Sequence, residues 1–358
     1  MSCDMTQKQE GKADRRRPGP LLALMALFAS PSAAAKLFQT VRWANGLACP
    51  HCLKDGREGK NVTKYCKYGY LQRYVCKDCD KTFNDKTGTP LHYKHIIVGE
   101  WMLSIWMFLT GPRNGISIRF IAESLGRTYK SVYYMMRGVM ALLANLPEKV
   151  LSGVGETDEL YIRAASKGVP LKTNGEDRTL PSRRGLPKGP GRGTFEKNMP
   201  MTTVYHQRST KDEPDITIFD VPTDRSRTLA GMAAERFERG STIITDEHAA
   251  YKSLEQRGYV HPTVNHSEGE YASGENNEIH TNNCECRAGL VKWWLKKHRG
   301  VSKRHLVSYV KSFQFVHNHR HYNMEERFVV TLAVILGQYS GRQAGEDADL
   351  ETLVRALS

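Results

Sequence analysis

The chain has 358 residues, of which 40% are hydrophobic and 25% are charged. This composition excludes an intrinsically disordered chain, and the length allows two or three domains. Lysine and arginine outnumber aspartate and glutamate by 52 to 38, so the formal net charge is +14. A basic excess of this size favours a polyanionic partner such as nucleic acid, because each neutralised phosphate releases counterions. Ribosome-associated and membrane-surface proteins share the property, so charge alone leaves these classes open.

The composition changes within the first 45 residues. Residues 1–20 are polar and basic and are predicted to form a disordered arm. Residues 21–45 are predicted to form one or two helices, with a break at Pro31 and Ser32. A basic start followed by an apolar run also resembles a signal peptide, although the run is too short to span a bilayer. We favour a cytoplasmic protein without a membrane segment, because the paired cysteines that follow suit a reducing compartment.

Four of the eight cysteines form two CxxC pairs: Cys49, Cys52, Cys76 and Cys79. Two such pairs can place four thiolates tetrahedrally around Zn²⁺. Between them, residues 64–75 alternate basic and aromatic side chains, as a pair of strands would. We therefore predict a zinc ribbon over residues 46–90 with one structural Zn²⁺. The alternatives are four free buried cysteines, or Cys66 as a substitute ligand, although Cys66 has no CxxC partner; His51 is expected to be exposed.

Residues 91–150 are predicted to be helical, beginning with an apolar core helix over residues 96–110. Further on, Ala122, Gly126 and Val132 follow the spacing of two helices that meet at a tight turn. This pattern predicts a helix-turn-helix whose second helix, about residues 128–138, can enter a major groove of DNA. An ordinary helical hairpin is the alternative. The side chains expected to face DNA are Arg127, Thr128, Tyr129, Lys130 and Ser131.

Residues 151–325 show a mixed α/β order. Strands are predicted at 156–163, 201–207, 215–221, 241–245 and 259–264, and helices at 226–239, 247–257, 283–298 and 302–318. Three strands, helix, strand, helix, strand, helix is the order of a ribonuclease-H-like fold, in which the fourth strand lies beside the first. Residues 166–198 are rich in Gly, Pro, Arg and Lys and are predicted to be a flexible insert, either solvated or clamping phosphates. Residues 326–358 are predicted to be a helical tail.

Three acidic residues occupy positions where this fold would bring them together. Asp158 lies on the first strand, Asp246 directly follows the fourth, and Glu285 begins a basic helix. Glu159 follows Asp158 and must point to the opposite face of the strand, so only one of the two can face the site. Asp246 could instead cap a helix, and Glu285 could simply interact with a helix dipole.

The helix that carries Glu285 has further candidate residues. Lys292 lies two turns after Glu285 on the same face, where it could hold a phosphate or form a surface ion pair. Trp293 and Trp294 are expected to be core residues, with stacking on an extruded base as the alternative.

Several stretches occur together in chain order: RWANGLACPHC at 42–52, KTGTP at 86–90, TDELY at 157–161, TDEHAAY at 245–251, VNHSEGEY at 264–271, HTN at 280–282 and FVHNHR at 315–320. On these stretches the chain resembles the DDE transposases of bacterial and archaeal insertion sequences, in the subgroup that pairs an N-terminal zinc ribbon with a ribonuclease-H-like core. Two features depart from that pattern: Cys284 and Cys286 flank Glu285, and the insert at 166–198 is large and basic.

The resemblance implies a catalytic triad of Asp158, Asp246 and Glu285 that cleaves DNA and transfers its strands. Two Mg²⁺ ions (or Mn²⁺) would be held by these carboxylates, with Asp158 bridging both, Asp246 on one and Glu285 on the other. The implied partners are the double-stranded terminal repeats of the element and the target DNA, bound by a homodimer or a larger synaptic assembly.

Two rival functions use the same residues differently. A non-catalytic DNA-binding protein derived from a transposase would use only the N-terminal half, but the intact triad disfavours it. A plain ribonuclease-H-like nuclease would cut without transferring strands and would not need a zinc ribbon.

Overall fold

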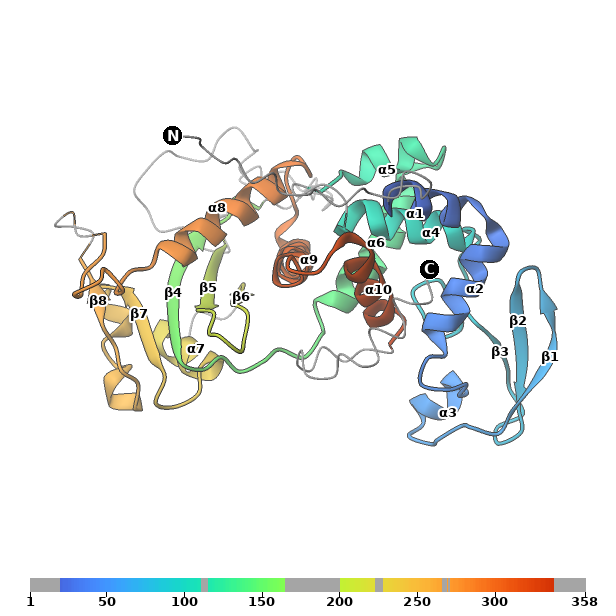
Figure 1. The fold of residues 1–358 in the computed structure, drawn as a ribbon, viewed down its shortest axis with the longest axis horizontal. Helices are drawn as coiled ribbons and strands as arrows, with labels where there is room; N and C mark the ends of the chain where they lie inside the picture. Colours follow the sequence, from blue (N-terminus) through green and yellow to red (C-terminus); the bar gives the residue numbers. More distant parts are fainter. Residues whose placement is uncertain are drawn as a thin grey trace, which may run out of the picture.

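The computed structural model describes residues 20–110, 115–164, 200–222, 228–265, 269 and 271–337. The arm predicted at residues 1–20 (except Pro20), the insert at 166–198 and the part of the tail after residue 337 lie outside the described residues. In Figure 1 a five-stranded sheet lies at one end of the molecule and a small three-stranded sheet lies at the other, with helices between them.

The chain begins with two short helices, α1 (Pro20–Ala29) and α2 (Pro31–Arg42). The predicted break is confirmed: the Ser30 hydroxyl accepts a hydrogen bond from the N–H of Ala33, and proline occupies the first turn of α2. Among the described residues no single helix is long and apolar enough to cross a membrane; α1 and α2 together would qualify by composition, but they meet at 102°. Both helices pack into the main core through Phe28 and Phe38.

The predicted strand pair is confirmed between the two CxxC motifs. A short helix, α3 (Pro50–Lys54), is followed by the antiparallel strands β1 (Val62–Tyr68), β2 (Leu71–Cys76) and β3 (Thr82–Asn84). The carboxylate of Asp85, which is fully buried, accepts hydrogen bonds from Trp43 Nε1 at 2.7 Å and the Tyr74 hydroxyl at 3.0 Å. This carboxylate therefore joins the small sheet to the end of α2.

Helical structure fills the next part of the chain, as predicted. Helix α4 (Val98–Ile105) continues as one π-helical turn, η1 (Trp106–Thr110), and α5 (Ile118–Ser124) leads to α6 (Tyr129–Leu143). Gly126 has φ +59°, a conformation that favours glycine, and it makes the tight turn between α5 and α6. Thr128 then caps α6 by accepting a hydrogen bond from the N–H of Ser131.

The larger sheet has the predicted strand arrangement. Its strands are β4 (Val154–Tyr161), β5 (Met201–Gln207), β6 (Ile216–Asp220), β7 (Thr242–Asp246) and β8 (Thr263–Val264). They are ordered β6-β5-β4-β7-β8, so the fourth strand of this sheet lies beside the first and runs parallel to it. Antiparallel pairing joins β4 to β5 and β5 to β6.

Helices cover both faces of the sheet (Figure 1). Helix α7 (Leu229–Arg236) packs on one face, where Tyr205, Ile218 and Ile243 contribute to a core of their own. On the other face lie α8 (Asn282–Lys296) and α9 (Leu306–Asn318), the latter preceded by a short 3-10 helix, η5 (Lys303–His305). The core on this second face continues without a break into α1, α2, α4, α5 and α6.

The last described helix, α10 (Met324–Ile335), belongs to the same core as the N-terminal helices. The ring of Phe328 packs edge-on against Phe28 of α1, with centroids 5.2 Å apart. The buried guanidinium of Arg42 donates to the carbonyl of Leu336 at 2.5 Å and to that of Thr87 at 3.2 Å. The C-terminal end of α10 is therefore fastened to α2 and to the end of the small sheet.

Two predicted elements are wrong. A helix was expected at 247–257, but the chain forms two single turns, η2 (Ala249–Tyr251) and η3 (Glu255–Arg257). Asp246 and His248 accept hydrogen bonds from the backbone two residues further on, and such local bonds compete with a regular helix. A strand was expected at 259–264, but β8 has only two residues, because Pro262 has no N–H to give to the ladder.

Candidate active site and metal centre

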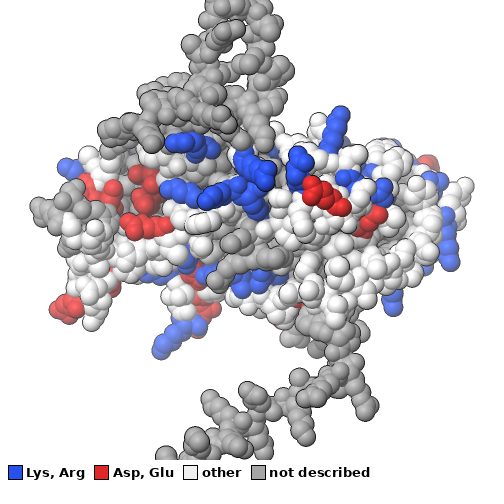
Figure 2. Space-filling model, turned by 90° about the horizontal axis from the view of Figure 1, so that it is seen from above, with Lys and Arg blue, Asp and Glu red and all other residues white. Residues whose placement is uncertain are grey.

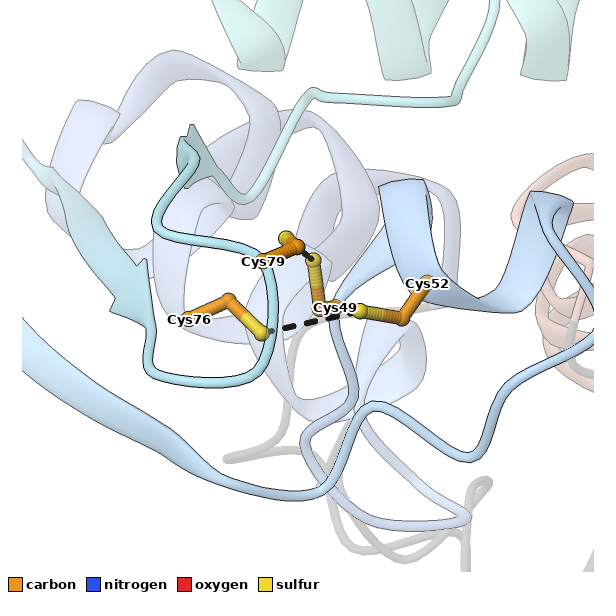
Figure 3. Close-up of side chains that lie close together, drawn as sticks. All are labelled: Cys49, Cys52, Cys76 and Cys79. Atoms are coloured by element: carbon orange, nitrogen blue, oxygen red, sulfur yellow. Dashed lines mark hydrogen bonds between the residues drawn. The ribbon is translucent and has the colours of Figure 1, made fainter.

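The four CxxC cysteines meet at one end of the small sheet (Figure 3). Their ligand atoms all lie within 4.8 Å of one another, with Sγ–Sγ distances of 3.7 Å for both Cys49–Cys79 and Cys52–Cys76. Four sulfurs at a Zn–S distance of about 2.3 Å would lie about 3.8 Å apart in a tetrahedron. The cluster therefore has the donor type and spacing that fit a zinc ion.

The backbone around the thiols is shaped for this cluster. Gly59 has φ +61°, and a Cβ at this position would lie 2.7 Å from the Cβ of Cys52. Its carbonyl accepts the N–H of Cys49. Cys66 is exposed on β1 and does not belong to the cluster, and His51 is not part of it either. The two CxxC pairs are thus the set that could hold zinc, as the sequence predicted.

The acidic residues of the large sheet share one face. The parallel pairing of β4 and β7 aligns Glu156 with Ile244, so Asp158 and Asp246 follow two residues later on adjacent strands. Paired residues of parallel strands point to the same side, and side chains two residues apart share a face. The carboxylate of Glu159 lies on the opposite face, where it accepts a hydrogen bond from the Tyr251 hydroxyl. Of the two adjacent acids, Asp158 is therefore the one that faces α8.

The charge environment of Asp158 connects the three acids. Burial raises the pKa of Asp158 to about 7, and the nearby carboxylates of Glu159, Asp246 and Glu285 add to the effect. A hydrogen bond from the N–H of Glu159 to Asp158 Oδ1, at 2.7 Å, opposes it. Residues separated by more than 120 positions are thus close enough for their charges to interact. They are less tightly gathered than the thiols: among the described residues, the cysteines are the one group already close enough to hold a metal ion.

Glu285 and Asp246 differ in their exposure and in their hydrogen bonds to nearby backbone. Glu285 lies in the first turn of α8 on its exposed side. Asp246 is half-buried at the end of β7, and its Oδ1 accepts the N–H of His248 at 3.1 Å. Asp246 therefore shapes the turn after β7, and this local bond occupies only one of its two carboxylate oxygens.

A further acid, which sequence reasoning missed, holds the start of α8. Glu156 is fully buried on the same face as Asp158, and its Oε2 accepts the N–H of Asn283 at 3.0 Å and that of Cys284 at 3.3 Å. Its Oε1 accepts from Asn283 Nδ2 and Arg208 Nε, both at 2.7 Å. The N-cap residue Thr281 makes no capping bond with its own side chain, so Glu156 caps α8 from the neighbouring strand.

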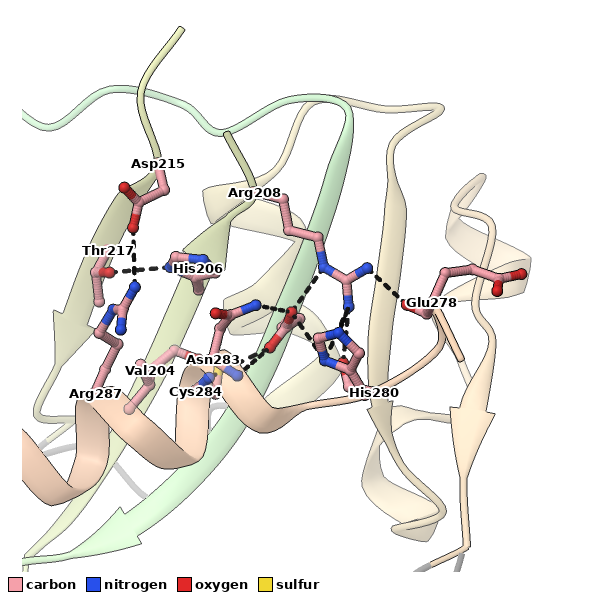
Figure 4. A network of polar contacts seen from close by, with 11 residues as sticks. Val204, His206, Arg208, Asp215, Thr217, Glu278, His280, Asn283, Cys284 and Arg287 are labelled. Atoms are coloured by element: carbon pink, nitrogen blue, oxygen red, sulfur yellow. Dashed lines mark hydrogen bonds and ion pairs between the residues drawn. The ribbon is translucent and has the colours of Figure 1, made fainter. Parts of the chain in front are cut away.

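Arg208 extends this contact to the loop before α8 (Figure 4). Its Nη1 donates to the carbonyl of Glu278 at 2.6 Å, and its Nη2 to that of His280 at 3.1 Å. Glu285 follows this anchored segment directly, so the buried pair of Glu156 and Arg208 determines where the third acid lies. The available sequence signal was a charged residue at an inward-facing strand position, which is rare unless it is paired.

The residues predicted to face DNA at the start of α6 all lie on the exposed surface, but four of them have local partners. The ring of Tyr129 stacks on that of Tyr133, with centroids 5.7 Å apart. Arg127 makes two hydrogen bonds of 3.0 Å to the carboxylate of Glu100. The hydroxyls of Thr128 and Ser131 lie 2.9 Å apart at the helix cap. Lys130 is exposed, as is Lys292 on α8.

Comparison with known proteins identifies the family. Residues 150–318 match the model of the ISXO2-like transposase domain. A protein of Halobacterium salinarum, described as an uncharacterized protein in transposable element ISH50, is 35% identical over 289 residues, which cover 80% of this chain and 90% of that protein. No solved structure gave a significant match. The chain therefore belongs to the insertion-sequence transposases that carry an ISXO2-like DDE domain.

Proposed function

We propose that this transposase cleaves the ends of its insertion sequence and joins them to target DNA, using Asp158, Asp246 and Glu285. The surroundings of Asp158 support the proposal: its pKa is raised mainly by burial, and the carboxylates of Asp246 from β7 and Glu285 from α8 raise it further. Several acids crowded at a partly buried point destabilise their own ionised forms, and a divalent cation relieves that repulsion.

The donor atoms suit Mg²⁺ or Mn²⁺. All three side chains offer carboxylate oxygens, which hard cations prefer, and a few carboxylates with water and substrate phosphate complete the coordination. Two such ions would activate the attacking oxygen and stabilise the leaving oxygen of an in-line displacement. Both other acids act on the pKa of Asp158, so Asp158 is assigned the position shared by the two ions, with Asp246 on one ion and Glu285 on the other.

The chain's own residues hold this site in place. Glu156 and Arg208 fix the first turn of α8, and with it Glu285, while β4 and β7 fix the two aspartates. Lys292 lies two helical turns beyond Glu285 on the same exposed side of α8. We assign Lys292 to a phosphate of the cleaved strand, because a lysine beside the acids can offset the charge of DNA approaching them.

DNA binding is assigned to the N-terminal half. In this division residues 46–90 form the zinc ribbon, residues 91–150 contain a helix-turn-helix, and residues 151–325 contain the ribonuclease-H-like core. The exposed N-terminus of α6, with Lys130, would meet the terminal repeat, and Arg127 would have to exchange Glu100 for a phosphate. Strand β1 is exposed along most of its length and carries Lys64, Tyr65 and Lys67. Paired DNA ends would require a dimer or larger assembly.

The decisive experiment incubates purified full-length protein with labelled DNA of the element's own ends and a target plasmid. We expect joined products in Mg²⁺ or Mn²⁺, and none in EDTA or with the Asp158→Asn variant. Specific binding of the ends without cleavage or joining would support the non-catalytic rival instead. Cleavage of RNA–DNA hybrids without strand transfer would support the nuclease rival.

A further inference from the structure

The outer face of α8 carries an exposed tryptophan. The expectation that both Trp293 and Trp294 are core residues is wrong for the first: Trp294 is 2% exposed and packs in the main core, whereas Trp293 is 63% exposed. The two differ because adjacent helical residues lie about 100° apart around the axis, so one faces the sheet and the other faces outward. Trp293 therefore presents a large flat ring to solvent on the same exposed side of α8 as Lys292 and Lys296.

Two lysines lie near this indole on α8, and a glycine lies one turn before it. Lys296 places its Nζ 4.5 Å from the ring centroid of Trp293, and Lys292 is the exposed neighbour before it. One turn earlier on the helix lies Gly289, where a Cβ would have nothing within 4 Å. The strip of helix surface that leads from Trp293 toward Glu285 therefore has no side chain at Gly289 to block access to the ring.

The distance to the acids suits a DNA strand held between the two points. Trp293 lies eight residues after Glu285, or about 12 Å along the axis at a rise of about 1.5 Å per residue. This corresponds to roughly three to four steps of a duplex strand at about 3.4 Å per step. A strand that runs along α8 with a phosphate at the acids would bring its terminal nucleotides to the indole.

The charge pattern of this face identifies the kind of partner. Figure 2 shows a band of lysine and arginine side chains with a group of acidic side chains on one side and further acidic side chains on the other. The exposed basic residues on and just after α8 are Lys292, Lys296, Arg299 and Arg304. A polyanion with flat apolar surfaces matches an indole among cations, and an unpaired nucleobase on a phosphate backbone is that chemistry. Acidic protein surfaces provide the charge but not the stacking surface.

We propose that Trp293 is a stacking platform for an unpaired base near the cleaved end of the DNA, with Lys292 and Lys296 holding the adjoining phosphates. This inference rests on the proposed function, since it requires a DNA strand at Glu285. The indole offers the ring face away from Lys296 to the base. Stacking is tolerant of sequence, so the platform would stabilise an opened end without selecting its bases.

The test uses full-length protein with Asp158→Asn, so that binding is measured without cleavage. Two fluorescent DNAs are compared: a fully paired element end, and the same end with its last four nucleotides unpaired and one replaced by 2-aminopurine. We expect Trp293→Ala to weaken binding of the unpaired end about tenfold and to abolish quenching of the 2-aminopurine. Binding of the paired end should change less than about twofold, and Trp293→Tyr should restore most of the quenching.

Controls separate this inference from the function on which it rests. Val260 is an apolar residue that is 59% exposed and pairs with Thr242, at the end of β7 away from Asp246, so Val260→Ala should bind both DNAs like the parent protein. Equal effects of Trp293→Ala on both DNAs, or no effect, would overturn the platform. If Trp293→Ala instead turned a dimer into a monomer in sedimentation, the indole would contact a second copy and the platform would again fail. DNA cleavage and joining are measured separately with the wild-type protein. If the wild-type protein neither cleaved nor joined DNA, the result would count against the proposed function.

Discussion

The thiol cluster and the acid cluster are assembled to different degrees. The four sulfurs come from the start of α3 and from the turn that begins at the end of β2, lie within 4.8 Å of one another and already have the spacing of a zinc tetrahedron. The three acids come from two strands and a helix, and they interact through charge without having closed to that distance. Structural metal sites are closed by protein ligands, whereas catalytic sites keep positions open for water and substrate. On the proposed function, the acid site would be completed by its cations and DNA.

The largest expected effect separates the two sites by function. Asp158→Asn, Asp246→Asn or Glu285→Gln should each lower DNA cleavage at least about 10³-fold, because each removes an anionic oxygen that the cations require. Zinc content, measured by atomic absorption, should stay at one per chain. Glu255→Gln removes an exposed acid outside the cluster and should cleave normally. An active Asp246→Asn variant would remove Asp246 from the site.

Substitution of a cysteine in the thiol cluster should remove the zinc and leave the three acids unaffected. Cys76→Ser should lose zinc and unfold residues 46–90, because structural zinc contributes about 10 kcal/mol or more to such folds. Binding of the terminal repeat should fall more than about tenfold, while Mn²⁺ binding at the acids should be unchanged. The exposed Cys66 provides the control: Cys66→Ser should keep its zinc. Retention of zinc by Cys76→Ser would show that the cluster has other ligands.

The buried pair beneath α8 tests whether the acid site depends on the helix position. Glu156→Gln keeps an oxygen that can cap α8 but leaves Arg208 without its counter-charge, which should lower stability by about 2–4 kcal/mol. Cleavage should fall about 10- to 100-fold through kcat, with little change in affinity for the DNA end. The double variant Glu156→Gln with Arg208→Gln removes the uncompensated charge and should recover melting temperature more than activity. Full recovery of both would assign the pair a purely structural role.

The smallest effect comes from protons competing with cations at Asp158. Its pKa of about 7 lies above the ordinary value of 3.8, so the carboxyl is protonated at low pH and cannot bind a cation. Lowering the pH below about 7 should therefore weaken Mn²⁺ binding, by up to about tenfold per unit, and raising it above 7 should have little further effect. Titration calorimetry checks this, with Asp158→Asn expected to show weaker binding and a flatter pH dependence. If the Mn²⁺ affinity of the wild-type protein did not change between pH 5.5 and 7, the prediction would be contradicted.

The sequence was informative wherever a local pattern determined the structure. The CxxC spacing predicted the thiol cluster, and the order of strands and helices predicted that β7 lies beside β4. Strand alternation predicted that Asp158 and Glu159 face opposite sides. The break before α2 was also readable from Pro31, although the residue that caps the helix is Ser30 and not Ser32.

Long-range contacts decided what the sequence did not reveal. Glu156 meets Arg208 from 52 positions away and Asn283 from 127 positions away, so no local pattern identifies its role. The helix expected at 247–257 fails because short polar side chains bond to nearby backbone. Trp293 and Trp294 are indistinguishable in sequence, and only the packing of α8 on the sheet separates them.

The contact of α10 with α1 and α2 has a consequence for synthesis. Phe328 and the carbonyl of Leu336 complete the core around Phe28 and Arg42. The N-terminal helices of this core are synthesised first and α10 last. Because chains emerge from the ribosome from the N-terminus onward, those early helices must wait for nearly the entire protein before their apolar faces are covered. A copy of the gene interrupted shortly before α10 would therefore yield a chain with an exposed apolar surface, prone to aggregation and proteolysis, in place of a shortened protein that still binds DNA.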